Sequence, residues 1–293
     1  MTDNPHKPPR PAVGARPLVT AIVPTYNGEQ FVDRTLECLA AQTWSPLEIL
    51  IGDDASSDRT PQIVAEFAAR HVNVTLVQRA DNLGWLRNCN ALMAQASGEL
   101  LFFAFHDDVV APAYVERLAT ALLDRPQAVL AFSDLTVAEV GGDPELAVFT
   151  ELEGRSSSLD RGFAMAKRPV NWWVPNRGLF RASAFRAVGG IRPNELGEYS
   201  ADWTWLLALA LRGEFVRVPE VLCEKFYKPG SLSKQWSHDD ASWRALAKAG
   251  IEEIRRSPLG PLAKAVLIAS LQDRVRLPNW LRQVGRRAAV LAR

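Results

Sequence analysis

The sequence is poor in the residues that build disulfide and zinc frameworks. Of its 293 residues, only three are cysteine and four are histidine. Cys38, Cys89 and Cys223 are odd in number and far apart, and the histidines lack the spacing of paired zinc ligands. A disulfide scaffold and a structural zinc site are therefore excluded, and we expect three buried thiols in a reducing compartment.

Long apolar runs and a secretion signal are also missing. The longest apolar stretches, 100–105 and 263–271, fall far short of the roughly 18 residues that span a bilayer. The first 17 residues are rich in Pro, Arg and Lys and have no apolar core, which predicts a disordered tail rather than a signal peptide. We therefore expect a cytoplasmic protein.

Several catalytic templates are not met. The first apolar run is followed by neither a G-x-G-x-x-G loop nor a Walker A lysine loop. The chain also has no G-x-S-x-G elbow and no H-E-x-x-H pair. We expect no nucleic-acid partner.

The net charge of +1 is unevenly distributed. Residues 241–293 carry 11 Lys/Arg and 3 Asp/Glu, a net of +8, which leaves −7 on the rest of the chain. This asymmetry indicates an acidic body with a basic C-terminal segment that can meet an anionic surface. Its last predicted helix has one apolar face, made of Trp280, Leu281, Val284, Ala288 and Leu291. That helix either docks on the domain or lies at the inner face of a membrane.

Strands and helices alternate along the first half of the chain. Apolar runs predict strands at 18–23, 47–51, 72–77, 99–105 and 128–132. Apolar residues at helical spacing predict helices at 30–42, 60–70, 84–96 and 113–123. Short links between such elements favour a mostly parallel sheet with helices on both faces, so the predicted fold class is α/β.

After residue 133 the alternation loosens. Residues 136–160 contain turn residues and short strands, whereas 182–188 and 201–212 are predicted helices. Two further strands are predicted at 215–218 and 221–227. From residue 241 onward we expect helices with breaks at Pro258, Pro261 and Pro278.

Three polar segments directly follow predicted strands, at 24–26, 52–54 and 106–108. Ligands of open α/β sheets bind beyond the carboxyl ends of the strands. Asp107 and Asp108 repel each other unless a cation offsets them, and their oxygens suit Mg²⁺ or Mn²⁺ bridging to a substrate phosphate. The alternative is a helix cap with a solvated neighbour. His106, beside the pair, is a further ligand, a hydrogen-bond donor to phosphate or neither.

Three other aspartates likewise have either a functional or a purely structural interpretation. Asp53 and Asp54 can accept hydrogen bonds from a nucleobase or a ribose, or form an Asx-turn before the next helix. Asp202 begins a strongly apolar helix whose macrodipole keeps a carboxylate ionised. It acts either as a general base on a hydroxyl or only as a stabilising charge.

The order and spacing of these motifs resemble family 2 glycosyltransferases over roughly residues 18–234. The matching stretches are V-T-A-I-V-P-T-Y-N at 19–27, the helix from 36 to Q-T at 42–43, E-I-L-I-G-D-D-A-S-S-D-R-T at 48–60, N-L-G at 82–84, R-N-C-N at 87–90, A-S-G-E at 96–99 and H-D-D at 106–108. On the acceptor side the landmarks are N-R-G at 176–178, G-G at 189–190, A-D at 201–202 and F-Y-K-P-G-S at 226–231.

The resemblance implies a GT-A fold and an inverting displacement on a nucleoside-diphosphate sugar, with UDP, GDP or dTDP as the nucleotide. It implies a divalent metal, Mn²⁺ or Mg²⁺, held by Asp107 and Asp108. It makes Asp202 the catalytic base. It assigns donor contacts to Pro24, Tyr26, Asp53, Asp54, Asn82, Arg87, His106, Asp107 and Lys228.

The sequence departs from the family pattern at two positions. The usual D-x-D-D reads Phe105-His106-Asp107-Asp108, so the first acid is a phenylalanine. The acid that often precedes the base is Ala201. These changes motivate one alternative, a degenerate non-catalytic binding protein. Another is a sugar-nucleotide nucleotidyltransferase, which would need a Gly- and Arg-rich loop where residues 24–27 stand.

The predicted organisation has three parts: a disordered tail at 1–17, a GT-A domain at 18–234 and a basic helical extension at 235–293. Within the domain, 18–133 would bind the nucleotide sugar and 134–234 the acceptor. The expected acceptor is a glycan or a lipid-linked molecule in cell-envelope polysaccharide biosynthesis.

Overall fold

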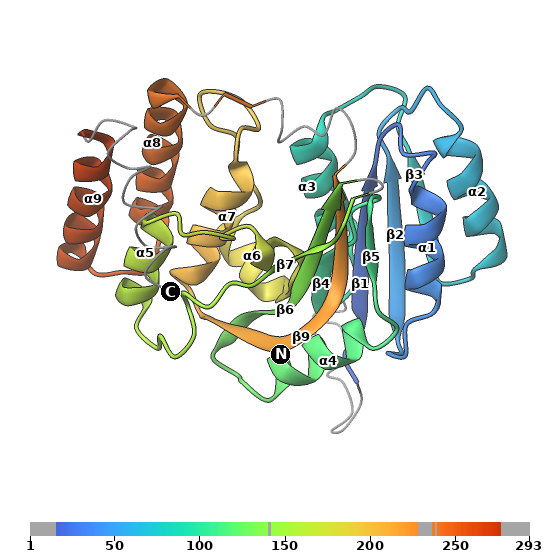
Figure 1. Cartoon of the computed structure of the whole chain (residues 1–293), viewed down its shortest axis with the longest axis horizontal. Coiled ribbons are helices and arrows are strands. Elements are labelled where there is room, and N and C mark those ends of the chain that lie inside the picture. Colours follow the sequence, from blue (N-terminus) through green and yellow to red (C-terminus); the bar gives the residue numbers. More distant parts are fainter. Residues whose placement is uncertain (1–15, 140–141, 228–235, 238, 277–293) are drawn as a thin grey trace, which may run out of the picture.

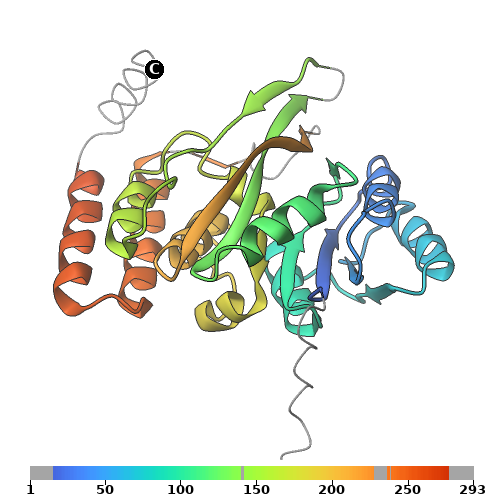
Figure 2. The same cartoon turned by 90° about the horizontal axis from the view of Figure 1, so that it is seen from below.

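The computed structural model describes residues 16–139, 142–227, 236–237 and 239–276. The strands in this part form one sheet in the order β3–β2–β1–β4–β8–β6–β9–β5, with β7 paired to β6 (Figures 1 and 2). The strands are β1 (Val19–Thr25), β2 (Leu47–Asp53), β3 (Val74–Gln78), β4 (Leu100–Phe103), β5 (Asp108–Val110), β6 (Ala128–Glu139), β7 (Glu145–Ala147), β8 (Leu179–Arg181) and β9 (Glu214–Tyr227).

The helices surround this sheet. They are α1 (Val32–Ala40), α2 (Thr60–Arg70), α3 (Trp85–Gln95), α4 (Tyr114–Leu123), α5 (Ser158–Ala166), α6 (Ala182–Val188), α7 (Ala201–Ala210), α8 (Asp240–Arg256) and α9 (Pro261–Arg276), with a 3-10 turn η1 (Val174–Arg177). Figure 1 shows α1 and α2 on one side of β1–β3, and α3, α6 and α7 on the other. Beyond α7, the helices α8 and α9 form an outer layer at the far end of the molecule.

The first half is the parallel sheet that the alternating pattern predicts. β1 pairs in parallel with both β2 and β4, and β2 pairs with β3. The register aligns Thr25 with Asp53, and Asp53 with Gln78. Because the strands run in the same direction, their polar carboxyl ends meet at one edge of the sheet.

The second half differs from the sequence prediction in its strands. One long strand, β9, replaces the two predicted at 215–218 and 221–227. Pro219 looks like a break, but the register skips from Val218 to Val221 against the neighbouring strand, so a bulge absorbs the proline. β6 extends seven residues past the predicted end at 132, and the predicted division at 133/134 falls inside this strand.

Residues 158–166 form a helix, α5, that the pattern of turn residues did not indicate. Ser157 caps it by accepting a hydrogen bond from the amide of Asp160, which is the N-cap chemistry of serine. The short strand β5 was likewise not predicted. It pairs antiparallel with β9, a strand more than a hundred residues later in the chain, so no local pattern indicates it.

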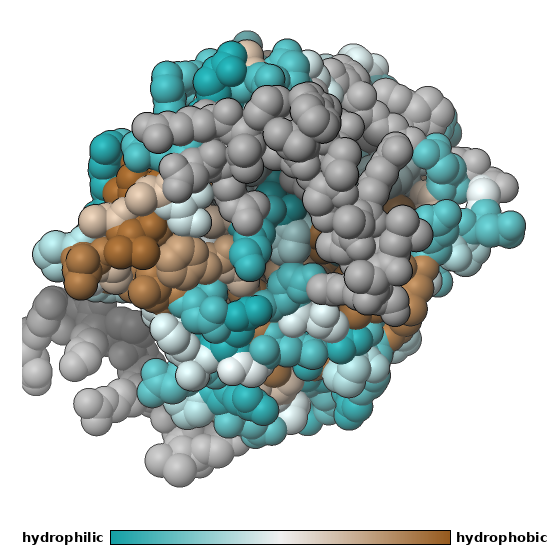
Figure 3. All heavy atoms as spheres, turned by 60° about the vertical axis from the view of Figure 1, so that its left-hand side comes forward, coloured by the Kyte–Doolittle hydropathy of each residue, from teal (hydrophilic) through white to brown (hydrophobic). Residues whose placement is uncertain are grey.

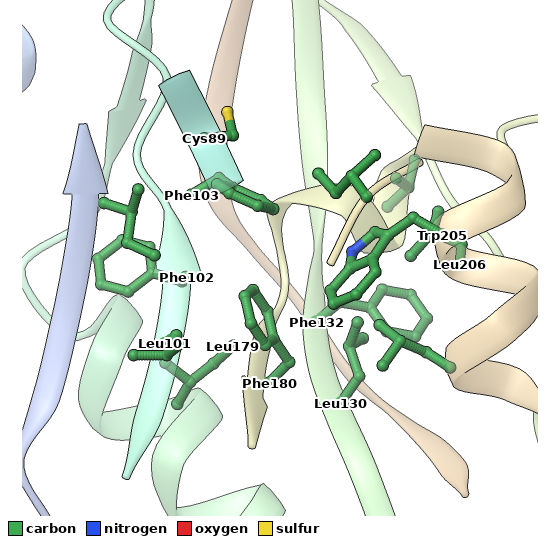
Figure 4. Packing of buried hydrophobic residues seen from close by; sticks show 14 of the residues in the cluster. Cys89, Leu101, Phe102, Phe103, Leu130, Phe132, Leu179, Phe180, Trp205 and Leu206 are labelled. Carbon is green, nitrogen blue, oxygen red and sulfur yellow. The ribbon is translucent and has the colours of Figure 1, made fainter. Parts of the chain in front are cut away.

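The core is densest around α7, in which every residue is buried except Asp202, which is half-buried. A helix that is apolar all round is typical of a buried core element. Figure 4 shows Phe180 of β8 between the residues of β4 and those of β6, with Trp205 of α7 facing it. The Phe180 and Trp205 rings meet edge to face at 5.6 Å, and Phe180 also contacts Phe103. This aromatic packing fixes α7 against the sheet.

The three cysteines are free thiols, as the sequence predicts. Cys89 and Cys223 are buried and Cys38 is half-buried. Burial raises the pKa of all three thiols.

The C-terminal helices begin and end close to the predicted prolines. α8 ends at Arg256 and α9 begins at Pro261. Two apolar side chains one turn apart on α9, Leu262 and Val266, are exposed, and Figure 3 shows hydrophobic residues gathered among hydrophilic ones on the side of the molecule that it brings forward. No helix within the described ranges is long and apolar enough to cross a membrane. The predicted amphipathic helix at 280–291 and most of the predicted tail at 1–17 lie outside the described residues.

Helix α3 ties the two halves of the fold together. The amide of Asn90 donates to the carbonyl of Ile191 at 2.7 Å and accepts from the Ile191 N–H at 2.8 Å. Gly190 has φ +91°, and a Cβ there would lie 2.8 Å from the Asn90 oxygen. The loop can therefore approach Asn90 only because residue 190 is glycine.

We expect Asn90→Ala to lower the free energy of unfolding by about 1–3 kcal/mol, because two backbone groups of Ile191 lose their partner. Urea denaturation followed by circular dichroism measures the loss. Gln95→Ala on the same helix is the control, since Gln95 is exposed and bonds only to Ala91 within the helix. Equal stability of the two variants would contradict the role of Asn90.

Candidate functional site

The carboxyl ends of β1 and β2 place two buried aspartates at the edge of the sheet. Asp53 accepts hydrogen bonds from the hydroxyl of Ser56 at 2.5 Å and from its N–H at 3.3 Å, which is an Asx-type turn. Asp54 accepts from the N–H groups of Leu83 and Gly84, both at 2.9 Å. Both carboxylates therefore shape the loops that border the site.

The loop before α3 brings Asn82 and Arg87 to the same region. The side-chain oxygen of Asn82 accepts from the N–H of Gly84, which also bonds to Asp54. Arg87 lies on the exposed side of α3, one turn into the helix. Glu198, from the second half, accepts a hydrogen bond from the N–H of Leu86 at 2.8 Å. The start of α3 is thus held from both halves of the fold.

Residues 104–107 continue the chain beyond β4 along the end of β1. The Nδ1 atom of His106 lies 3.3 Å from the carbonyl oxygen of Pro24. Its ring packs against Gly28, where a Cβ would come within 2.6 Å of it. Tyr26 is 45% exposed beside this segment. His106 is therefore wedged between backbone segments, and the ring of Tyr26 faces solvent.

The adjacent acids Asp107 and Asp108 have different environments. Asp107 is half-buried, whereas Asp108 begins β5 and is only 3% exposed. The Nε atom of Arg177 donates to Oδ2 of Asp108 at 2.9 Å. Burial raises the pKa of the Asp108 carboxyl, and the charges of Arg177 and Lys225 oppose that rise. The sequence treated the two acids alike, but the fold buries one against an arginine.

Arg177 is held in place from several sides. Its guanidinium lies 4.7 Å from the centre of the Phe105 ring and 5.6 Å from that of Trp173. The hydroxyl of Tyr114 donates to the Arg177 carbonyl. Phe105, which stands where the family pattern has an acid, therefore provides the guanidinium with a stacking surface.

Asp202 lies in the first turn of α7, as the sequence predicts. The preceding Ser200 has φ 46°, and its hydroxyl accepts from Arg168 at 2.9 Å. Burial raises the pKa of Asp202, while the charges of Arg168 and Arg177 lower it. The macrodipole was expected to keep this carboxylate ionised, but burial has the larger effect.

Arg177 connects the two acidic positions of the site electrostatically. Its positive charge lowers the pKa of both Asp108, from the first half, and Asp202, from the second. The sequence singled out residue 177 only as part of an N-R-G landmark. Lys225 and Glu198 were not singled out, because their relation to the site arises from pairing between distant segments. Lys228 lies outside the described residues.

A divalent metal ion fits this edge of the sheet only if a bound substrate supplies some of the ligands of the ion. Among the described residues, no group of three His, Cys, Asp or Glu side chains could hold a metal. Oδ1 of Asp108 is buried and accepts no hydrogen bond from the described chain, and Asp107 is adjacent to it. Mg²⁺-type ions commonly use one or two carboxylates and complete their shell with water and substrate phosphates. The two aspartates suit such an ion.

Part of the chain is similar in sequence to known proteins. Residues 20–146 match the family model described as Glycosyl transferase family 2. The putative glycosyltransferase EpsH of Bacillus subtilis is 27% identical over 205 residues, which cover 70% of this chain and 54% of that protein. The succinoglycan biosynthesis protein ExoO of Rhizobium meliloti is 30% identical over 143 residues, 49% of this chain and 40% of that protein. The chain spans about a third to a half of the length of such curated relatives.

Solved structures match over more of the chain. Staphylococcus aureus TarS 1–349 in complex with UDP-GlcNAc has a TM-score of 0.67 at 18% identity, covering 87% of this chain and 72% of that one. The mannosyltransferase PcManGT of Pyrobaculum calidifontis, in complex with GDP-Man and Mn²⁺, has a TM-score of 0.56 at 20% identity, covering 98% and 78%. At such identities the likeness establishes the fold, and the predicted GT-A fold is confirmed.

We expect Asp108→Asn to lower the free energy of unfolding by about 3 kcal/mol, because it leaves the buried Arg177 charge without a counter-ion. The matched control is Asp107→Asn, which removes the adjacent, half-buried charge and should change stability by less than about 0.5 kcal/mol. Urea denaturation of both variants provides the comparison. If the two variants unfolded at the same urea concentration, the ion pair would not stabilise the fold.

Proposed function

We propose that the protein transfers a sugar from a nucleoside-diphosphate donor to an acceptor hydroxyl with inversion, because its residues 20–146 match the model of glycosyl transferase family 2. The observation that carries this proposal is the convergence of polar groups at one sheet edge. The segments after β1, β2 and β4 meet there, and Arg177 links the Asp107–Asp108 pair to Asp202 of the second half.

The donor nucleotide would bind across the ends of β1 and β2. The exposed ring of Tyr26 supports this, because a nucleobase can stack on an accessible aromatic ring. Pro24, Asp53 and Asp54 border the same edge, and Asp53 or Asp54 would read the base. The ribose and diphosphate would then extend toward the remaining donor contacts, Asn82, Arg87, His106 and Asp107.

The proposed metal ion is Mn²⁺ or Mg²⁺. Asp107 and the unpartnered oxygen of Asp108 would hold it together with the diphosphate. When bound, such an ion supplies positive charge that stabilises the leaving diphosphate.

Asp202 is the proposed general base. It would take the proton of the acceptor hydroxyl as that oxygen bonds to the anomeric carbon and the bond from that carbon to the diphosphate breaks. A carboxylate whose pKa is raised by burial accepts a proton more readily near neutral pH than an exposed one. The attack comes from the face opposite the leaving group, so the anomeric configuration inverts.

The proposed acceptor is a glycan or a lipid-linked molecule in cell-envelope polysaccharide biosynthesis. The relative ExoO is described as a succinoglycan biosynthesis protein, which favours a polysaccharide product. A cytoplasmic location with peripheral contact to the membrane fits a lipid-linked acceptor. The exposed Leu262 and Val266 of α9, next to the basic segment that follows, support that contact. By the family resemblance, Lys228 would be a further contact of the diphosphate.

We expect a nucleoside diphosphate to stabilise the folded protein in the presence of Mn²⁺. At a ligand concentration of a hundred times Kd, the stabilisation is about 2.7 kcal/mol and raises the melting temperature. A thermal-shift panel of UDP, GDP, dTDP and CMP, with and without Mn²⁺, identifies the base. No shift with any of them in Mn²⁺ would contradict the proposed function.

We expect Asp202→Asn to retain nucleotide affinity but to lose transfer by about 10²–10⁴-fold, the usual contribution of a general base. In the wild type, kcat/KM should fall as the pH drops through a pKa above the usual range of an aspartate, since burial raises it. A product assay with donor sugar measures both. Asp33→Asn, also in the first turn of a helix but exposed, is the control. Full activity of Asp202→Asn would show that another group is the base.

A further inference from the structure

Two largely buried cationic side chains, Arg177 and Lys225, flank Asp108 and have no role in the proton transfer proposed above. Lys225 lies directly opposite Asp108 in the β5–β9 pair, so the two side chains point to the same face of the sheet. Arg177 reaches Asp108 from η1. Lys225 is 9% exposed, and the Arg177 side chain is 12% exposed.

Lys225 is nearly buried without a hydrogen-bonding partner. In the part of the chain that the structure describes, its ammonium makes no hydrogen bond or ion pair, and its contact is the ring of Tyr227 at 4.1 Å. The charge of Asp108 attracts this ammonium, but no described carboxylate accepts a hydrogen bond from it, and buried charges are normally both paired and hydrogen-bonded. The ring only partly offsets the cost of burying the charge, so the lysine is suited to an anion that enters the site.

Arg177 is only partly committed to Asp108. Its Nε atom donates to the carboxylate, whereas its two terminal nitrogens donate no hydrogen bond to the described residues. Neither terminal nitrogen is fully buried, so both remain accessible to a ligand. A guanidinium has five N–H donors in a planar fork that matches the geometry of phosphate oxygens. The stacked Phe105 ring keeps this fork in one orientation.

The formal charges of the four ionisable side chains grouped around Asp108 cancel before any ion arrives. Asp107 and Asp108 contribute two negative charges, and Arg177 and Lys225 contribute two positive ones. A site with two unopposed carboxylates would repel a diphosphate and would need a metal ion to accept it. Here the fold itself supplies the compensating cations.

Resting on the proposed function, we propose that Arg177 and Lys225 bind the diphosphate of the donor directly, so that nucleotide affinity persists without a metal ion. The metal then assists the transfer step rather than creating the binding site. Phe105 is part of this arrangement, because a carboxylate at that position would compete with the diphosphate for the guanidinium.

Isothermal titration calorimetry with UDP, GDP and dTDP, in EDTA and in Mn²⁺, tests the proposal. We expect the nucleotide that binds in Mn²⁺ to bind in EDTA with Kd raised by less than about tenfold. Lys225→Met keeps the apolar stem against Tyr227 and removes the charge. It should weaken binding in EDTA by about tenfold or more, the value of a hydrogen bond to a charged group. Phe105→Asp should make binding strongly dependent on Mn²⁺.

The matched control for Arg177→Gln is Arg16→Gln. Arg16 also combines a ring, Trp44 at 4.6 Å, with an ion pair to Glu116, but it lies far from the sheet edge that forms the site. Arg177→Gln should weaken binding in EDTA and Arg16→Gln should not. If Arg177→Gln fails to fold, Lys225→Met still tests the proposal, because Lys225 has no ion pair among the described residues and its replacement should not unfold the protein.

The outcomes separate this proposal from the proposed function. If Mn²⁺ supports nucleotide binding, EDTA abolishes it and Lys225→Met binds like the wild type in Mn²⁺, the metal alone holds the diphosphate and this inference is wrong. The proposed function then stands. If UDP, GDP and dTDP all fail to bind, in Mn²⁺ as well as in EDTA, both are contradicted.

Discussion

The buried ion pair between Arg177 and Asp108 is the constraint on which the site depends. A carboxylate that is 3% exposed needs a partner, and the hydrogen-bonded partner here is Arg177, which η1 of the second half brings against β5 of the first. Closing that pair places Phe105 under the guanidinium and brings the same positive charge near Asp202. One interaction therefore sets the relative positions of the proposed donor and acceptor groups.

The sheet is built to make that contact. The chain leaves the parallel half after β4, passes through Asp107 and joins β9 as the short strand β5. Lys225 of β9 thereby comes opposite Asp108, and α7 packs behind through Phe180 and Trp205. Asn90 and Glu198 fasten α3 to the loop that leads into α7. The edge is thus a junction of both halves and not a property of the nucleotide-binding half alone.

The sequence predicted the parts of the fold that depend on local pattern. Apolar runs and helical stripes located β1, β2, α2 and α6 within a few residues, and the ordered motifs at the strand ends identified the GT-A fold. Pairing between distant segments left no local pattern. Asp108 and Arg177 are 69 residues apart, so nothing in the adjacent pair Asp107-Asp108 told which acid the fold would bury. Pro219 led to the wrong prediction of two strands in place of β9 for the same reason, because only the pairing with β6 shows that a bulge accommodates the proline.

The central claim is that a nucleoside diphosphate binds at this junction, with its phosphates beside Arg177 and Lys225. A crystal structure of the protein with UDP or GDP, whichever gives the larger thermal shift, tests it most directly. The account predicts the base near Tyr26 and the diphosphate in contact with Arg177 and Lys225. Density for the nucleotide elsewhere, for example in the groove lined by Arg192, Lys248 and Arg256, would contradict it.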